Sequence, residues 1–277
     1  MTDRKIPLAG VLGHPIVQSK SPRLFAHWLK TYDRPGYYIP IDVSEGDLER
    51  VIRTMPQMGF VGCNVTAPHK VAVLEIADLA TDRATLIGAA NTLIFRKDGK
   101  IHADNTDGYG FIANLKQGAP GWAPSIGPAA VLGAGGAARA VIASLIDVGV
   151  QEIFLSNRTR PNAEALKSAF GSKITVVDWV QAGNMIEEAA TVVNTTSLGM
   201  QGKPEFRIPL DGLRRGTVVT DLVYAPLKTR LLAEAEDAGC VVVDGLGMLL
   251  HQAVPGFERW FGVRPEVDVN TRAAILS

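Results

Sequence analysis

Several features that mark specialised classes of protein are scarce in this 277-residue sequence. Aromatic residues make up 6%, and the only two cysteines, Cys63 and Cys240, lack metal-ligand spacing and suit a reducing compartment. His102 and His251 have no companion at metal-ligand spacing either. Lys plus Arg and Asp plus Glu both number 28, so no excess of charge indicates a polyanionic partner. We therefore expect no metal site and no binding of nucleic acid.

Long uninterrupted hydrophobic runs are also missing. One long apolar segment, residues 131–150, contains Arg139 and Asp147, which argues against a membrane span. The apolar run that begins at Ile6 ends at His14, which is too soon for a signal peptide and instead predicts a first strand. We expect a cytoplasmic protein that does not associate with membranes. The hydrophobic fraction of 47% rests on Ala, Val, Leu and Ile, as buried parallel strands under covering helices require.

The strongest local signal is a glycine turn between a strand and a helix. Residues 129–155 show an apolar run, a turn containing Gly133, Gly135 and Gly136, a helical pattern and a second apolar run. Such a unit places a helix N-terminus, with its unpaired N–H groups and positive dipole end, against a pyrophosphate. Gly133 permits the tight turn, Gly135 lets the backbone approach the phosphates, and Ala138 fills the third, small position. The sequence therefore predicts dinucleotide binding.

The residues after the second strand indicate which dinucleotide binds. An NAD-binding unit usually has an acid about 20 residues beyond the first glycines. Here the sequence is Ser156-Asn157-Arg158-Thr159-Arg160, which offers two guanidinium groups and no carboxylate. Arg binds a ribose 2′-phosphate through charge-assisted hydrogen bonds, whereas a carboxylate would repel it. We predict NADP; the alternative is that both arginines are solvated loop charges.

Strands and helices alternate on both sides of this unit. Before it, we expect strands at 6–12, 37–41 and 59–65, and a hairpin over 89–103 that turns at Asp98-Gly99. After it, strands are predicted at 174–177, 191–194, 217–221 and 241–244, with helices over 249–260 and 268–276.

This order predicts an α/β fold with two domains. The first is an N-terminal α/β substrate-binding domain over 1–107, completed by residues 249–277, whose helices pack back on it. The second is a Rossmann-like domain over 108–248 that binds NADP.

Four polar stretches lie outside the dinucleotide unit, each at or just after the C-terminal end of a predicted strand. They are residues 18–22, 64–70, 90–92 and 105–108. In open α/β sheets that edge binds ligands. We therefore expect these stretches to form the wall that faces the cofactor.

Several of these residues also have ordinary structural explanations. Ser21, which precedes a proline, is typical of a helix N-cap. Lys70 at the start of a helix is normally solvated, and Asn91 could simply form a turn. Gln252 is harder to explain in this way, because its helix is otherwise apolar and a buried amide needs partners.

Taken together, the motifs resemble those of the shikimate dehydrogenase family, with the related quinate/shikimate dehydrogenases. In chain order they are SKSP, NVTAPHK, AANT, DNTDG, GAGGAARA, NRT, NTTSLGM, DLVYAPLKT and DGLGMLLHQA, and they cover essentially the whole chain. Such a set is far more specific than any one of its members. The resemblance implies an enzyme that reversibly reduces 3-dehydroshikimate to shikimate with NADPH, a step toward the aromatic amino acids.

The resemblance also implies individual roles. Lys70 and Asp107 would be the catalytic pair: the lysine supplies positive charge and a proton to the carbonyl oxygen, and a nearby carboxylate favours its ammonium form. Either member could move the proton. The substrate residues would be Ser19, Ser21, Thr66, Lys70, Asn91, Asp107, Tyr224 and Gln252. The cofactor residues would be Asp82, Gly133, Ala134, Gly135, Gly136, Ala137, Asn157, Arg158, Thr159, Arg160, Pro161, Asn162, Leu222 and Gly245.

Two departures from the family pattern bear on these roles. Gln18 stands where many members have His, and Pro161 with Asn162 alters the run after NRT, so Arg160 would complete the phosphate site. One alternative is an NAD-dependent quinate/shikimate dehydrogenase. An alternative of another class is a non-catalytic module that binds NADP as a signal. A monomer and a homodimer are both compatible with the sequence.

Overall fold

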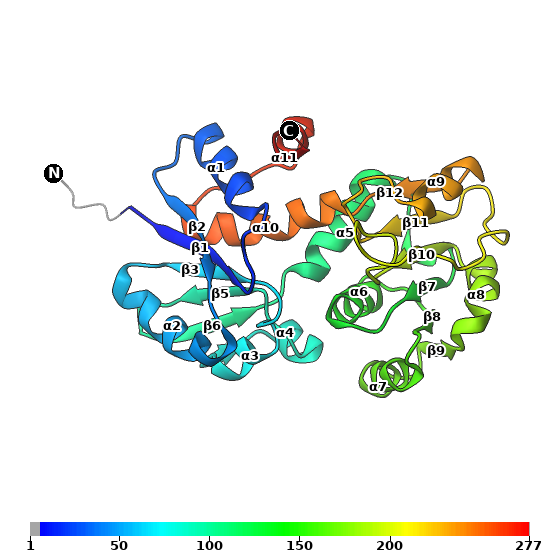
Figure 1. Cartoon of the computed structure of the whole chain (residues 1–277), viewed down its shortest axis with the longest axis horizontal. Helices are drawn as coiled ribbons and strands as arrows, with labels where there is room; N and C mark the ends of the chain where they lie inside the picture. The colour runs from blue at the N-terminus through cyan, green and yellow to red at the C-terminus, as the bar shows by residue number, and fades with distance from the viewer. Residues whose placement is uncertain (1–5, 277) are drawn as a thin grey trace. The chain divides into compact units, whose positions relative to one another are not determined.

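The computed structural model describes residues 6–276, which form two compact units (Figure 1). The first unit comprises residues 6–106 and 252–276, and the second comprises residues 107–251. Each unit is built on a sheet of six strands, and each sheet carries helices on both faces. The predicted α/β class is therefore confirmed. No helix among the described residues is long and apolar enough to cross a membrane.

The sheet of the first unit is mixed. Strands β1, β2 and β3 run parallel, β5 runs antiparallel to both of its neighbours, and β6 pairs with β4 in parallel. The C-terminal ends of β1, β3 and β6 consequently lie at the same edge as the N-terminal end of β5. The strand order is β2 (Tyr37–Asp42), β1 (Leu8–Gly13), β3 (Gly62–Val65), β5 (Thr92–Phe95), β6 (Ile101–Asp104), β4 (Leu79–Ala80).

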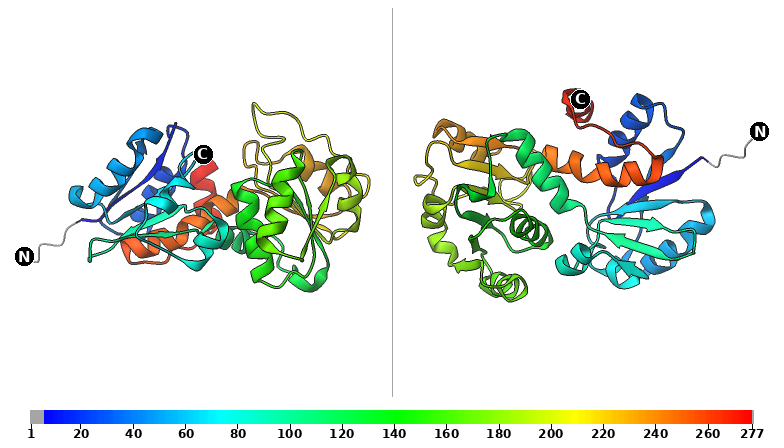
Figure 2. Two further views of the ribbon diagram at one scale, coloured as in Figure 1. Left: turned by 90° about the horizontal axis from the view of Figure 1, so that it is seen from below. Right: turned by 180° about the vertical axis from the view of Figure 1, so that it is seen from behind.

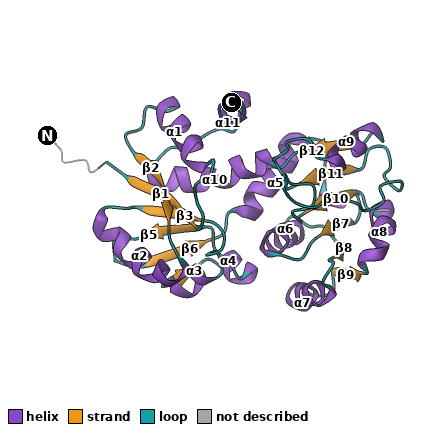
Figure 3. Cartoon of the chain, viewed as in Figure 1, coloured by secondary structure: helices purple, strands orange, loops and turns teal. Residues whose placement is uncertain are grey.

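Helices cover both faces of this sheet, as Figure 3 shows. One face packs against an aliphatic core that includes Leu48 and Ile52 of α2 (Leu48–Thr54) and Val73 of α3 (Ala72–Ile76). The other face carries an aromatic cluster from α1 (Ser21–Thr31), β2 and α10 (Leu246–Phe261). The chain also forms α4 (Asp82–Ile87), which the sequence analysis did not identify, and 3₁₀ turns at Glu45–Asp47 and Met55–Met58.

The C-terminal segment belongs to the first unit. Residues from Gln252 onward, in α10 and α11 (Val269–Leu276), group with it. Helix α11 packs on α1, where the Trp28 indole nitrogen donates to Thr271 Oγ1 over 3.4 Å. The predicted return of the C-terminal helices to the first domain is confirmed.

The second unit is an all-parallel sheet. Its strand order is β12 (Val241–Val243), β11 (Val218–Asp221), β10 (Thr191–Asn194), β7 (Ala129–Leu132), β8 (Ile153–Ser156), β9 (Ile174–Val177). The order reverses direction between β7 and β10. In open parallel sheets, ligands bind outside the C-terminal ends of the strands at such a switch point.

Short apolar strands suit this sheet because both faces are buried. In β7, Ala129 and Val131 join one core, and Ala130 and Leu132 join the other. The first core is covered by α5 (Asp107–Gly118), α6 (Gly136–Asp147) and α7 (Arg160–Phe170). The second is covered by α8 (Ala182–Glu188), α9 (Arg230–Asp237) and a loop containing Phe206 and Ile208. Figure 2 shows these helices on the two sides of the sheet.

Candidate active site

The glycine turn after β7 lies at the switch point of the parallel sheet. Gly133 has φ +106°, and a Cβ there would lie 2.5 Å from Thr195 Oγ1, so only glycine fits without strain. By contrast, outside the adjoining stretch of chain no described atom lies within 4 Å of the Cβ position at Gly135 or Gly136. The turn leads into α6, whose first N–H groups have no intrahelical acceptor. The result is an open backbone surface with the polarity that an anion requires.

Asn157 fixes the loop that follows β8. Its Oδ1 accepts a hydrogen bond from the Ala134 N–H over 3.1 Å, and its Nδ2 donates to the Thr159 carbonyl over 2.8 Å. The asparagine thereby links the glycine turn to the segment that carries the two arginines.

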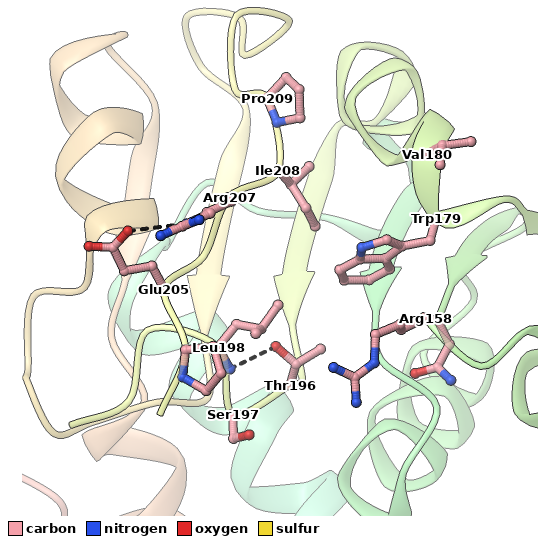
Figure 4. A pocket seen from close by; sticks show the side chains of 12 residues that line it. Arg158, Trp179, Val180, Thr196, Ser197, Leu198, Glu205, Arg207, Ile208 and Pro209 are labelled. Carbon is pink, nitrogen blue, oxygen red and sulfur yellow. Dashed lines mark hydrogen bonds and ion pairs between the residues drawn. The ribbon is translucent and has the colours of Figure 1, made fainter. Parts of the chain in front are cut away.

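A cavity of about 560 Å³ opens beside this loop (Figure 4). It is lined by segments that follow β8, β9 and β10, and Arg158 and Trp179 both extend into it. Opposite them lie Thr196 and Leu198, whose loop is held by a hydrogen bond from the Leu198 N–H to Thr196 Oγ1 over 3.1 Å. Among the described residues, Arg158 has no ion-pair partner. Its charge is therefore available to a ligand.

Arg160 is in a different situation. Its guanidinium pairs with Asp178 and, over 2.9 Å, with Glu164. The hydrogen bond to Asp178 raises the pKa of Arg160 above its ordinary value. Two residues of the same type, adjacent to the same turn, thus differ in the charge they can offer to a ligand.

Asp221 joins the loops after β10 and β11. Its Oδ1 accepts from Asn194 Nδ2 and the Val223 N–H, both over 2.9 Å, and its Oδ2 accepts from Thr229 Oγ1 over 2.7 Å. Burial raises the pKa of Asp221 to about 6, although these three hydrogen bonds act in the opposite direction. The carboxylate is fully buried.

Two of the predicted cofactor residues meet near this carboxylate. A Cβ at Gly245 would lie 2.4 Å from the Leu222 carbonyl oxygen, so the chain can pass there only as glycine. The neighbouring Tyr224 is half-buried, and this burial raises the pKa of its hydroxyl.

In the first unit, Asn91 is the centre of a buried polar group at the sheet edge. Its Oδ1 accepts from the Thr106 N–H over 2.9 Å and from Thr92 Oγ1 over 2.9 Å, and its Nδ2 donates to Gln252 Oε1 over 3.2 Å. The Thr106 hydroxyl donates to the Gln252 carbonyl over 2.8 Å. Asn91 therefore does not simply form a turn, because its side chain joins three other residues. Gln252 has the hydrogen-bond partner that we expected for an amide on an otherwise apolar helix.

Two loops bring Thr66 and Lys70 to the same edge. The Thr66 N–H donates to the Leu12 carbonyl over 2.8 Å at the end of β1, and the Lys70 carbonyl accepts from the Ala90 N–H over 2.8 Å. The backbone of the catalytic candidate Lys70 is thus tied to the residue beside Asn91. Asp107, the other member of the predicted pair, is the buried first residue of α5.

An ion pair anchors the strand that leads toward Asp107. The buried carboxylate of Asp104 accepts from Arg83 Nε over 2.7 Å, from Arg83 Nη2, and from Thr81 Oγ1 over 2.8 Å. Burial alone would raise the pKa of Asp104, but the hydrogen bonds from Arg83 and Thr81 lower it overall. The end of β6 is therefore held by charge.

Ser19 and Ser21 lie together after β1, but the predicted cap was wrong. Lys20 occupies the N-cap position in right-handed helical geometry, so Ser21 is already the first residue of α1 and caps nothing. Instead, Ser19 Oγ accepts a long hydrogen bond of 3.4 Å from the Ser21 N–H. The Ser21 side chain is free of the capping role that the sequence suggested for it.

Family models match three parts of the chain. The substrate-binding domain of shikimate dehydrogenase matches residues 11–93, the shikimate/quinate 5-dehydrogenase model matches 126–200, and the C-terminal domain of shikimate 5′-dehydrogenase matches 245–274. A shikimate dehydrogenase (NADP+) of Cereibacter sphaeroides (strain ATCC 17025) is 70% identical over 273 residues, covering 99% of this chain and 98% of that protein.

The chain belongs to the shikimate dehydrogenase family.

Solved structures of the shikimate dehydrogenase family share this fold. The Thermus thermophilus enzyme in complex with NADP(H) and shikimate has a TM-score of 0.87 at 34% identity, with 98% of both chains covered. A quinate dehydrogenase from Corynebacterium glutamicum in complex with NAD has a TM-score of 0.90 at 32% identity, also with 98% of both chains covered. The family identified from the motifs is confirmed.

Some residues that line the cavity were not among those predicted from the sequence. Trp179, Arg207 and Ile208 line the cavity but lie in loops without a recognisable turn signal. Thr196 and Leu198 belong to the NTTSLGM motif after β10, and their position beside the switch point is the signal that could have identified them. Among the described residues, no group of three or more His, Cys, Asp or Glu side chains could hold a metal ion.

Proposed function

We propose that this chain catalyses the NADP-dependent, reversible reduction of 3-dehydroshikimate to shikimate. The observation that carries the proposal is 70% identity, along essentially the full chain, to a protein named for this activity. Arg158, which has no ion-pair partner in the part of the chain that the structure describes, lines the cavity beside the glycine turn. This supports NADP as the cofactor, since the 2′-phosphate needs a cation there.

The second unit would hold NADP, which supplies the hydride when bound. The backbone of Gly133, Ala134, Gly135, Gly136 and Ala137 is suited to the pyrophosphate. Arg158 binds the 2′-phosphate, and Asn157 keeps its loop against the glycine turn. The remaining cofactor candidates are Asp82 of the first unit and, in the second unit, Thr159, Arg160, Pro161, Asn162, Leu222 and Gly245. Arg160 contributes least, because two carboxylates already neutralise it.

Most of the residues that would hold the substrate and move the proton belong to the first unit, whereas Asp107 and Tyr224 belong to the second. Ser19 and Ser21 bind the carboxylate, and Thr66, Asn91 and Gln252 bind ring hydroxyls, with Tyr224 helping to position the substrate. Lys70 offers charge and a proton to the developing oxyanion, and Asp107 is the other member of the proposed catalytic pair. The support for this set is that Asn91 and Gln252 share a hydrogen bond at the edge where the Lys70 backbone is anchored.

Initial rates with four substrate pairs test the proposal. Shikimate or quinate is offered with NADP or NAD, and the absorbance of the reduced cofactor is followed. We expect shikimate with NADP to give the highest kcat/KM. A preference for quinate with NAD would contradict the proposal and support the alternative, a quinate dehydrogenase. The similarity to the Corynebacterium glutamicum structure is the reason to test this alternative.

A non-catalytic NADP sensor is the alternative of another class. It predicts NADP binding in calorimetry with no turnover on shikimate or quinate. The dense set of polar groups around Asn91 favours an enzyme, since a sensor has no need of a site for a polyhydroxylated acid. We further propose that the protein works in the cytoplasm and that it forms a homodimer, which light scattering would detect.

A further inference from the structure

The hydroxyl of Tyr38 is buried behind the serine pair and belongs to no motif. Tyr38 is 8% exposed, and its ring stacks on Phe25 with 3.7 Å between centroids and 13° between planes. Its hydroxyl donates to Asn64 Oδ1 over 2.7 Å. The Ser21 side chain also hydrogen-bonds to Tyr38, and Ser21 is itself buried. The phenol therefore lies between Ser21 and Asn64.

The direction of each proton in this group follows from the acceptors around Asn64. Asn64 Nδ2 lies 3.2 Å from the Asn91 carbonyl, which can only accept, so the amide nitrogen must face Asn91 and the amide oxygen must face Tyr38. Tyr38 has one proton and gives it to that oxygen. Ser21 must then donate its own proton to Tyr38.

The same network continues to the ring-binding candidates. Asn64 Nδ2 also donates to Thr92 Oγ1 over 3.2 Å, and the Thr92 hydroxyl donates to Asn91 Oδ1. The Nδ2 of the same Asn91 amide donates to Gln252 Oε1. A continuous set of hydrogen bonds thus connects the serine proposed for the carboxylate to the amides proposed for the ring hydroxyls.

We propose that Tyr38 is a positioning residue for carboxylate recognition, which acts through Ser21 and does not touch the substrate. When a carboxylate arrives, the Ser21 proton turns toward it, and the Tyr38 hydroxyl turns from Asn64 to donate to Ser21 Oγ. A hydroxyl that both accepts and donates in such a series is a stronger donor than an isolated one. This inference rests on the proposed role of Ser21.

A Tyr38→Phe variant tests the idea, because it keeps the ring stack on Phe25 and removes only the hydroxyl. We expect the KM for shikimate to rise about 5–20-fold, with kcat within about threefold and the KM for NADP unchanged. Tyr37→Phe is the matched control, since the Tyr37 side chain is 60% exposed. A shikimate KM equal to that of the wild type would overturn the proposal.

Shikimate methyl ester separates a carboxylate effect from a general loss of structure. Because the ester carries no charge, Tyr38→Phe should change its KM by less than about twofold. An equal rise for acid and ester would show that the hydroxyl only maintains the fold. Unfolding midpoints of both variants provide the same check.

A double-mutant cycle with Ser21→Ala tests whether Tyr38 acts through Ser21. In the Ser21→Ala background, adding Tyr38→Phe should change the KM for shikimate by less than about twofold. The same fold-change in both backgrounds would contradict action through Ser21. If Ser21→Ala raises KM but Tyr38→Phe does not, only the role of Tyr38 fails. If Ser21→Ala leaves KM unchanged, the proposed function of Ser21 fails, and the role of Tyr38 fails with it.

Discussion

The two sheet edges at which we propose that the ligands bind are built from different chemical groups. At the edge of the first sheet, polar side chains hydrogen-bond to one another, and Asn91 alone contacts Thr92, Thr106 and Gln252. At the edge of the second sheet, the glycine turn offers bare backbone and open space, and Arg158 has no ion-pair partner among the described residues.

This difference matches the two ligands in the proposed function. A small polyhydroxylated acid is recognised by many fixed donors and acceptors, which must be held in place before it arrives. A pyrophosphate requires backbone N–H groups, a helix N-terminus and room to approach. Substitutions at the first edge should therefore change turnover and stability, whereas substitutions at the second should change cofactor affinity.

The largest effect should come from Lys70→Ala. Loss of the proposed proton donor should lower kcat by about 10²–10⁴ with little change in the KM for NADP. Steady-state kinetics measure this, and Lys97→Ala, which removes an exposed lysine of the same unit, is the control. Near-normal turnover would show that Lys70 is not part of the mechanism. It would also contradict the expectation that substitutions at the first edge change turnover.

The next effect concerns the stability of the first edge. Asn91→Ala leaves the Thr106 N–H and the Thr92 hydroxyl without their acceptor in a buried site. The free energy of unfolding should fall by about 2–4 kcal/mol, measured by urea denaturation. Asn184→Ala, at an exposed position of α8, should change it by less than about 0.5 kcal/mol. Similar losses in both variants would show that Asn91 is not a structural centre.

A third comparison uses the two arginines of the second edge. Arg158→Ala should raise the KM for NADP about 10–100-fold and leave the KM for NAD nearly unchanged, because only NADP has the 2′-phosphate. Arg160→Ala should have a much smaller effect, since Asp178 and Glu164 already pair with it. Equal effects of Arg158→Ala on both cofactors would refute the phosphate assignment.

A further expected effect is a pH dependence of stability that arises from Asp221. Its pKa of about 6 in the folded protein lies above the ordinary value, so the folded state binds this proton more tightly than the unfolded state does. Its contribution to stability is complete at low pH and is lost as the pH rises through about 6, at a cost of about 1–3 kcal/mol.

Asp221→Asn should abolish this contribution. The difference in unfolding free energy between wild type and variant, measured by urea denaturation, should shift against the wild type between about pH 4 and pH 7. A difference that stays constant with pH would mean that Asp221 titrates normally.

Much of the fold followed from local patterns. The strands at Ile174–Val177 and Thr191–Asn194 appear where apolar runs predicted them, and the glycine turn is where the sequence placed it. Helices α7, α8 and α9 were not located, although parallel strands need such crossovers, and that requirement was the available signal. Strand β4 has only two residues and exists through its pairing with β6, so no local pattern could have revealed it.

The wrong prediction for Ser21 shows that one local sequence can fit two positions at the start of a helix. A serine before a proline fits either the N-cap or the first turn of a helix. Lys20 adopts right-handed helical geometry, which moves the start of α1 so that Ser21 lies inside it. The helix also packs against the aromatic cluster through Phe25 and Trp28, a tertiary contact that the local serine-proline pattern does not contain.

By itself, the sequence determined most of the strands and their order along the chain, the site of the phosphate turn and the family, because these depend on periodicity, on glycine at a left-handed backbone position and on short motifs. Only the tertiary structure decided that Arg160 is neutralised while Arg158 lines a cavity with no ion-pair partner within residues 6–276, and that Asp221 is held fully buried. Asp178 reaches Arg160 from the loop after β9, and Asn194 reaches Asp221 from a neighbouring strand. Charge, hydration and proton affinity are set by neighbours that the chain brings together from distant positions.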